Sequence, residues 1–109
     1  MELNKDSLCI AYIIVGSEDE AKDISRILIK NRLAACINLQ FNLKSLYMWE
    51  EEIREDTEVL ILAKTRKELM PKLIETVIAK HTYECPCILE IPIQNGNPLF
   101  IKWINQETV

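Results

Sequence analysis

Glycine is scarce in this sequence: only 2 of the 109 residues are glycine. A P-loop and a dinucleotide-binding loop both need several closely spaced glycines, so neither can be written here. A Gly-x-Ser-x-Gly elbow is also absent, and the single histidine would have to act as the base for any serine or cysteine nucleophile. The sequence gives no support for these forms of catalysis, and we expect a protein that is not an enzyme.

Long apolar runs and basic clusters are missing as well. The longest apolar run, 8–15, has eight residues, whereas a membrane-spanning helix needs about 20. Lys and Arg total 13 against 17 for Asp and Glu, the net charge is −4, and the basic residues do not cluster. We expect neither a membrane span nor a nucleic-acid surface. The polar, acidic N-terminus lacks the features of a secretory signal, which predicts a cytoplasmic protein.

The composition is typical of one compact globular domain, with 49% hydrophobic and 28% charged residues. We expect a single domain over 1–109, with residues 1–7 flexible. A domain this rich in apolar residues does not need disulfides, and the cytosol opposes them. The sequence therefore predicts four free thiols, at Cys9, Cys36, Cys85 and Cys87.

The start of the chain predicts a central strand followed by a helix. The run 8–15 is typical of a strand buried on both faces. Ser17 and Glu20 form a capping box, in which the serine accepts a backbone N–H and the glutamate reaches back. Apolar residues at helical spacing then predict an amphipathic helix up to about Asn31.

A long hairpin follows this helix. Residues alternate in character over 35–41, and 43–49 is also extended, so the two segments form one ribbon that bends or bulges near Asn42. The acidic residues 50–52 turn the chain, and 58–64 predicts the returning strand.

The second half of the chain repeats the pattern of strand end and helix. Thr65 and Glu68 form a second capping box that opens a helix up to Lys80. Pro71 would remove a backbone hydrogen bond inside that helix, so the helix either kinks there or starts near Met70.

The last predicted elements are a strand and a short helix. Residues 87–91 form a strand that ends around Pro92, which indicates either an edge position or the end of the strand. Asn97 is an N-cap and Pro98 occupies the first helical position. The apolar face of this helix carries Leu99, Phe100, Trp103 and Ile104.

The predicted order is strand, helix, strand, strand, helix, strand, helix. Right-handed crossovers turn this order into an α+β, ferredoxin-like fold: two βαβ halves form a four-stranded antiparallel sheet with both main helices on one face, followed by a short C-terminal helix. The other sheet face remains bare, yet the strands place apolar residues there too. A bare apolar face of this size predicts a homo-oligomer.

One segment has the composition of a metal site. His81, Cys85 and Cys87 place an imidazole and two thiols within seven residues, a combination suited to Cu(I) or Zn(II). A Cys-x-Cys pair on a strand supplies only two ligands on one face, so a neighbouring subunit would have to complete the shell. The alternatives are that the cysteines are small buried hydrophobes and that the histidine caps a helix end.

Several ordered motifs closely resemble the CutA family of divalent-cation tolerance proteins, from about residue 10 to the C-terminus. The motifs are Leu-Ala-Ala-Cys-Ile-Asn at 33–38, Ser-Leu-Tyr-Met-Trp-Glu at 45–50, Glu-Val-Leu at 58–60 with Lys64 and Thr65, His-Thr-Tyr-Glu-Cys-Pro at 81–86, and Gly-Asn-Pro at 96–98 with Trp103. The resemblance implies a ferredoxin-like fold, a homotrimer like that of the PII signalling proteins, and an association with tolerance of copper and other divalent cations. It also implies a cleft formed by Tyr47, Trp49, Lys64, Tyr83 and Glu84.

The sequence departs from the family at its copper-associated positions. Some members carry a cysteine at the end of the first strand and a His-His pair after the second helix, where this chain has Val15 and Lys80-His81. Glu51 also stands where the family has glycine. The resemblance therefore carries His81 alone as a metal ligand. That Cys85 and Cys87 supply soft ligands in compensation is our own inference.

Two rival functions share the expected fold. A PII-like small-molecule sensor needs a flexible loop with Gly and Arg for phosphates, and the region from 41 to 52 offers acidic residues instead. A scaffolding trimer of the same shape without a metal role is the related alternative. An acylphosphatase-like enzyme needs an anion-holding loop, but residues 16–19 are acidic.

Overall fold

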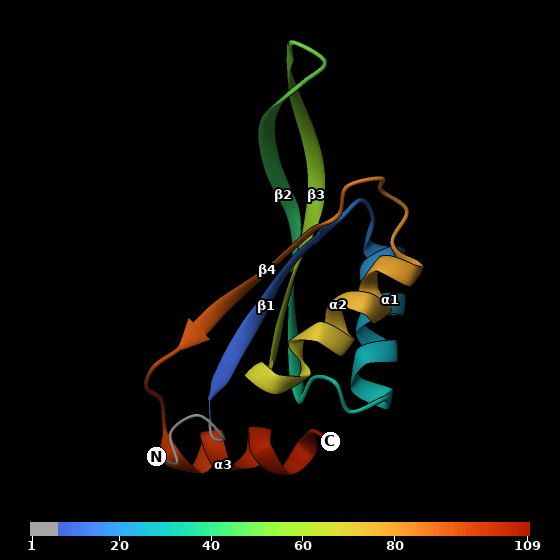
Figure 1. Cartoon of the computed structure of the whole chain (residues 1–109). Helices are drawn as coiled ribbons and strands as arrows, with labels where there is room; N and C mark the ends of the chain where they lie inside the picture. Colours follow the sequence, from blue (N-terminus) through green and yellow to red (C-terminus); the bar gives the residue numbers. More distant parts are fainter. Residues whose placement is uncertain (1–6) are drawn as a thin grey trace.

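The computed structural model describes residues 7–109 (Figure 1). The elements are β1 (Leu8–Val15), α1 (Glu18–Lys30), β2 (Cys36–Trp49), β3 (Glu52–Arg66), the 3-10 turn η2 (Lys67–Leu69), α2 (Met70–Lys80), β4 (Cys87–Ile93) and α3 (Pro98–Glu107). The strands form one antiparallel sheet in the order β2-β3-β1-β4. This order confirms the ferredoxin-like α+β prediction. Apart from Ser7, whose carbonyl oxygen accepts the Lys67 N–H at 3.0 Å, the predicted flexible segment lies outside the described residues.

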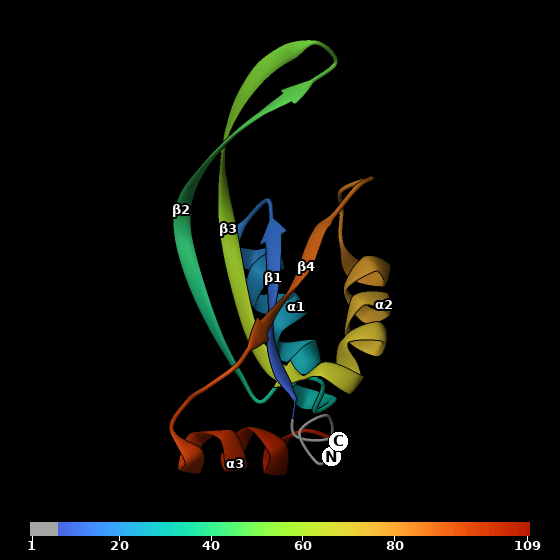
Figure 2. The same cartoon turned by 60° about the vertical axis from the view of Figure 1, so that its left-hand side comes forward.

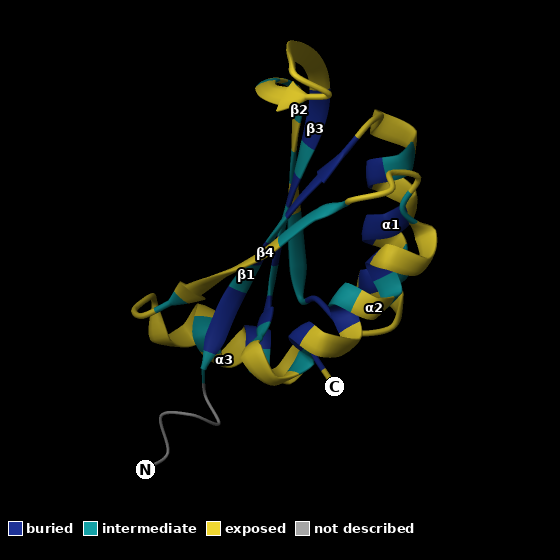
Figure 3. Ribbon diagram, turned by 45° about the horizontal axis from the view of Figure 1, so that its top comes forward, coloured by how far each residue is buried: buried dark blue, intermediate teal, exposed yellow. Residues whose placement is uncertain are grey.

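Helices α1 and α2 cover the same face of the sheet, as predicted, and α3 lies at the far end of the molecule (Figures 1 and 2). The core forms between the sheet and these two helices. Its buried residues lie along β1 and on the helix faces that point toward the sheet (Figure 3). Each large aliphatic side chain there stabilises the fold by about 1.5–3 kcal/mol. The core includes Cys9, Ile13, Val15, Ile24, Leu28, Ile61, Leu73 and Val77.

Strand β1 is central, as its apolar sequence predicts, because it pairs with both β3 and β4. Strand β4 lies at the edge of the sheet, where Pro92 can occupy a strand without breaking an inner ladder. No helix of residues 7–109 is long and apolar enough to cross a membrane.

Strands β2 and β3 form a hairpin that extends well beyond the two helices (Figures 1 and 2). The register shifts between Gln40 and Leu43, and Asn42 has φ 59°, so the bulge predicted near Asn42 is confirmed. The two-residue turn at Glu50 and Glu51 has φ values of 51° and 68°. Strand β3 is longer than the predicted 58–64. We call residues 43–57 the arm.

The second predicted capping box is wrong. Thr65 is fully buried within β3, and its hydroxyl donates to the carbonyl oxygen of Leu33 at 2.6 Å instead of capping a helix. The chain leaves the strand through η2, and α2 begins at Met70. Pro71 therefore lies in the first turn, where its missing N–H removes no helical hydrogen bond. Of the two alternatives, the start near Met70 is confirmed.

Helix α3 has the predicted cap, since the Asn97 side chain accepts the Leu99 N–H at 3.0 Å with Pro98 following it. Its expected apolar face does not join the core, however. Only Ile104 is buried among the apolar residues of α3, whereas Leu99 is 77% exposed. The rings of Phe100 and Trp103 stack on one another at 5.4 Å instead.

Candidate functional site

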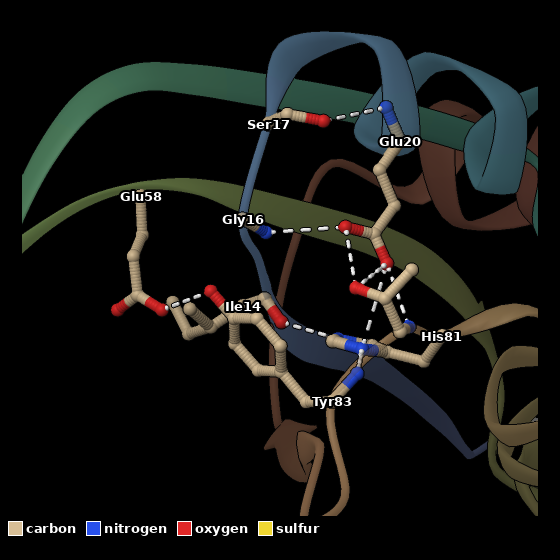
Figure 4. Close-up of polar contacts among 8 residues, drawn as sticks. Ile14, Gly16, Ser17, Glu20, Glu58, His81 and Tyr83 are labelled. Atoms are coloured by element: carbon tan, nitrogen blue, oxygen red, sulfur yellow. Dashed lines mark hydrogen bonds and ion pairs between the residues drawn. The ribbon is translucent and has the colours of Figure 1, made fainter.

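A cluster of polar side chains lies where the end of α2 meets the turn between β1 and α1 (Figure 4). His81 caps α2 there, and its side chain is 0% exposed. Its Nε2 lies 2.7 Å from the carbonyl oxygen of Ile14, and its Nδ1 accepts the Tyr83 N–H at 3.1 Å. Because a carbonyl only accepts and an N–H only donates, these contacts match an imidazole that donates from Nε2 and accepts at Nδ1. Both ring nitrogens are therefore in use.

The carboxylate of Glu20 holds the segment that follows α2. It accepts the Gly16 N–H at 3.3 Å and the Thr82 N–H at 3.0 Å, and it lies 3.6 Å from His81 Nδ1. The Glu20 N–H donates to Ser17 Oγ at 3.1 Å, so half of the predicted capping box is confirmed. The return bond goes to the residue before the N-cap, which connects the helix start to the loop instead of closing the box.

The Tyr83 ring lies over Gly16, and its hydroxyl reaches Glu58 on β3. Its hydroxyl donates to Glu58 Oε2 at 2.7 Å, and its ring lies 4.8 Å from the imidazole of His81. A Cβ on Gly16 would lie 2.9 Å from the hydroxyl oxygen, so only glycine allows this approach. Burial and the adjacent Glu58 raise the pKa of Tyr83 well above its usual range, which keeps the hydroxyl protonated and donating.

Glu58 lies on the sheet face opposite the helices, because its neighbour Val59 belongs to the core. It is only 6% exposed. Asp56, two residues earlier on the same face, accepts a hydrogen bond from the hydroxyl of Tyr47. Asp56 and Glu58 are thus each bonded by a tyrosine hydroxyl, and within residues 7–109 neither of these two carboxylates forms an ion pair.

The structure places the three predicted metal ligands differently from one another. His81 is buried and fully hydrogen-bonded, Cys85 is exposed, and Cys87 is half-buried. Burial, Glu58 and Cys85 raise the pKa of Cys87, which disfavours its thiolate. In the described part of one chain, no group of three or more His, Cys, Asp or Glu side chains is positioned to hold a metal ion. All four cysteines are free, as predicted.

The residues of the cleft implied by the resemblance do not gather in one place within a single chain. Tyr47 and Trp49 lie on the arm and are partly exposed, and Glu84 is exposed beyond Tyr83. Tyr47 and Tyr83 nevertheless donate to neighbouring carboxylates of β3, at Asp56 and Glu58 respectively.

Lys64 lies apart from the cluster, on the sheet face away from the helices. Its Nζ lies 3.8 Å from Cys36 Sγ, bonds to Asn38 Oδ1, and lies 6.0 Å from the centre of the Phe100 ring. These contacts attach β3 to β2 and to α3.

Sequence reasoning missed Gly16 and Glu58 as members of the site. Glu58 belongs to a motif of the resemblance, but no local pattern indicates that its carboxylate is buried beneath a tyrosine 25 residues further along the chain. Glu20 is predicted only as a helix cap, and its contact with Thr82 spans 62 residues. Such contacts depend on the tertiary fold.

The fold and this site define a small ferredoxin-like protein with one covered sheet face, one open apolar face and a polar cluster at the sheet end. Residues 9–107 match the family model described as CutA1 divalent ion tolerance protein, and the chain therefore belongs to the CutA1 family. This membership agrees with the expectation that the chain is not an enzyme.

Relatives support the assignment. The chain is 39% identical over 102 residues to Protein CutA of Mus musculus, covering 94% of this chain but 58% of that protein. It spans 65% of the Xenopus laevis homolog. It is 41% identical over 99 residues to the Divalent-cation tolerance protein CutA of Thermus thermophilus, covering 91% of this chain and 96% of that protein.

Solved structures share the fold. CutA1 from Oryza sativa matches with a TM-score of 0.93 and 32% identity, covering 94% of each chain. The Thermus thermophilus protein matches with a TM-score of 0.91 and 40% identity, covering 94% of this chain and 99% of that one. Relatives named chloroplastic and periplasmic also occur, so the family is found in more than one compartment.

Proposed function

We propose that this chain forms a cytoplasmic homotrimer that takes part in the response to divalent metal ions, copper among them, and that it acts as one domain without catalysing a reaction. The observation that carries the assembly is the exposed apolar surface of the arm and the open sheet face. On the arm, Leu46, Met48 and Ile53 are 67%, 65% and 74% exposed.

The arm would be at best marginally stable as an uncovered two-stranded ribbon. Two strands without a second layer are marginal in water, and this ribbon has no helix against either face (Figure 2). Leu46 and Met48 project from one face, and Tyr47 and Trp49 from the other. Both faces therefore need a covering layer, which neighbouring copies of the chain supply in our proposal.

The open sheet face extends this apolar surface. Leu89 and Ile91 on β4 are exposed beside Tyr12 and Ile10 on β1, which are only half-buried. A contiguous apolar face of this kind marks a protein interface. The resemblance to PII-like trimers supports three copies around one axis.

The metal role rests on the family and on the chemistry of the loop before β4. A Thermus thermophilus relative is named a divalent-cation tolerance protein. In this chain, Cys85 and Cys87 offer thiols suited to a soft ion such as Cu(I). His81 would have to release the Tyr83 N–H to act as a ligand. We therefore propose that the two thiols bind a metal ion weakly and that a neighbouring subunit supplies the remaining ligands.

Competition titration of Cu(I) against a chelator tests this role. The wild-type chain is compared with a variant carrying Cys85→Ser and Cys87→Ser, and Cys36→Ser is the matched control because that thiol lies elsewhere on the sheet. The double variant should bind Cu(I) more weakly, whereas the control should bind like the wild type. Equal affinity in all three proteins would remove the thiols from the proposal and favour a scaffolding trimer.

A further inference from the structure

We propose that Glu58 is an assembly residue, whose carboxylate forms an ion pair with an arm cation, Arg54 or Lys44, of a second copy of this chain. The inference rests on the trimer proposed above and deepens it, because it names a polar contact that the interface needs. Nothing in the family match assigns a role to this side chain.

The first support is that Glu58 is a largely buried carboxylate with a single hydrogen-bond donor from its own chain. One oxygen accepts the Tyr83 hydroxyl at 2.7 Å, and within residues 7–109 no other hydrogen bond and no ion pair reaches the carboxylate. The residue is nonetheless only 6% exposed in a single chain. A buried carboxylate with one neutral donor is costly unless a cation joins it.

The second support is the sign of the local charge. Glu20, Asp56 and Glu58 all lie close enough to Tyr83 to raise its pKa. No lysine or arginine of the described chain forms an ion pair with Asp56 or Glu58. The surroundings of the tyrosine hydroxyl are therefore negatively charged, which favours a cation in a partner that covers them.

The third support is the position of Glu58 on the open apolar face. A second copy that covers Leu60 and Leu62 on the same face of β3 also covers Glu58, which removes its remaining water. A metal ion is the less suitable occupant, because the described chain gathers no third ligand here. A lysine or arginine of the covering copy can pair with Glu58 without any further ligand.

The arm supplies that cation, since it is the exposed apolar element that a neighbouring copy must cover. It carries two basic residues. Lys44 Nζ already bonds to Thr57 Oγ1 at 2.7 Å, whereas Arg54 forms no ion pair within the described residues. Arg54 also offers a planar fork that matches a carboxylate, which makes it the first candidate.

The substitution Glu58→Gln tests the proposed ion pair, because assembly should weaken if the pair exists and tighten if it does not. Glutamine keeps the size of the side chain and still accepts the Tyr83 hydroxyl. If a cation of a second copy pairs with Glu58, the variant leaves that cation buried without its partner and weakens assembly. If the carboxylate stays unpaired in the assembly, the variant removes a buried charge and tightens assembly.

The measurement is the concentration at which the assembly dissociates, followed by sedimentation with and without a metal chelator. We expect Glu58→Gln to raise this concentration by about tenfold or more, while the same substitution at the exposed Glu75 of α2, on the other side of the molecule's sheet, changes it little. Unchanged or tighter assembly of Glu58→Gln overturns the inference, as does a wild type that a chelator reduces to the level of the variant. Far-UV circular dichroism confirms that each variant is folded.

A double-mutant cycle identifies the partner. Arg54→Gln and Lys44→Gln are each combined with Glu58→Gln. The substitution at the true partner should weaken the wild-type assembly, and it should weaken the assembly of the Glu58→Gln variant little further. Independent, additive losses for both residues overturn the inference and leave the trimer intact. A wild-type chain that is monomeric at every concentration overturns the trimer as well, so the two failures are distinguishable.

Discussion

The imidazole Nε2 of His81 donates to the carbonyl oxygen of Ile14 at 2.7 Å and thereby fastens the end of α2 to the end of β1. The other ring nitrogen orders the loop that leads to β4 by accepting the Tyr83 N–H. The only histidine of the chain thus has a structural task that leaves no free lone pair for a metal. The alternative reading of His81 as a helix-end residue agrees with this geometry.

Replacing His81 with alanine should lower the free energy of unfolding by about 2–4 kcal/mol. The change leaves the Ile14 carbonyl and the Tyr83 N–H without their partners and opens a cavity beneath Tyr83. Denaturant unfolding measures the loss. Lys80→Ala, one residue earlier and exposed, is the control and should change stability by less than about 0.5 kcal/mol. A loss no larger than that of the control would contradict the structural role.

Gly16→Ala should cost about 1–3 kcal/mol, because the new Cβ meets the Tyr83 hydroxyl at 2.9 Å and displaces it from Glu58. In a Tyr83→Phe background the same change should cost clearly less, since the hydroxyl is gone. The matched control is Gly96→Ala, whose Cβ meets only Ile101 at an ordinary 3.5 Å. Equal costs for the two glycines would argue against a close contact between Gly16 and the Tyr83 hydroxyl.

Glu51→Gly should stabilise the protein by about 0.5–1 kcal/mol. Glu51 has φ 68°, a left-handed conformation that costs L-residues about 1–2 kcal/mol, and glycine adopts it freely at some loss of chain entropy. Glu52→Gly lies in β3 and should instead destabilise by a similar amount. The midpoint of thermal unfolding measures both variants. A lower midpoint for Glu51→Gly would show that the turn is not strained.

Cys9 and Cys85 should differ sharply in reactivity. Cys9 is fully buried, and burial raises its pKa to about 11, so at pH 8 only about one thiol in a thousand is thiolate. Cys85 is exposed. Alkylation followed by mass spectrometry should label Cys85 rapidly in the native protein and Cys9 only after denaturant is added. Rapid native labelling of Cys9 would mean that β1 opens readily.

The sequence predicts the elements whose signals are local. The cap at Ser17, the bulge near Asn42 and the cap at Asn97 each depend on a few neighbouring residues, and all three are found. The capping box predicted at Thr65 is wrong because a long-range contact decides the position of this side chain. Its hydroxyl finds a buried carbonyl 32 residues away, at Leu33, and the long-range bond outweighs the local motif.

The candidate site is less predictable, because its members come together only in the tertiary fold. Tyr83 is flagged by the resemblance, but its partner Glu58 and the clearance that Gly16 provides depend on how three separate segments meet. The apolar face of α3 misleads in a related way. Spacing shows that Phe100 and Trp103 share a face, but not that this face lies on the surface.

The mass of the untagged protein in solution tests the central claim, that this chain assembles through its arm and open sheet face. Light scattering at micromolar concentration should give about three times the 12.7 kDa mass of one chain. A mass of one chain at that concentration would contradict the account, because the exposed arm and sheet face would then have no partner.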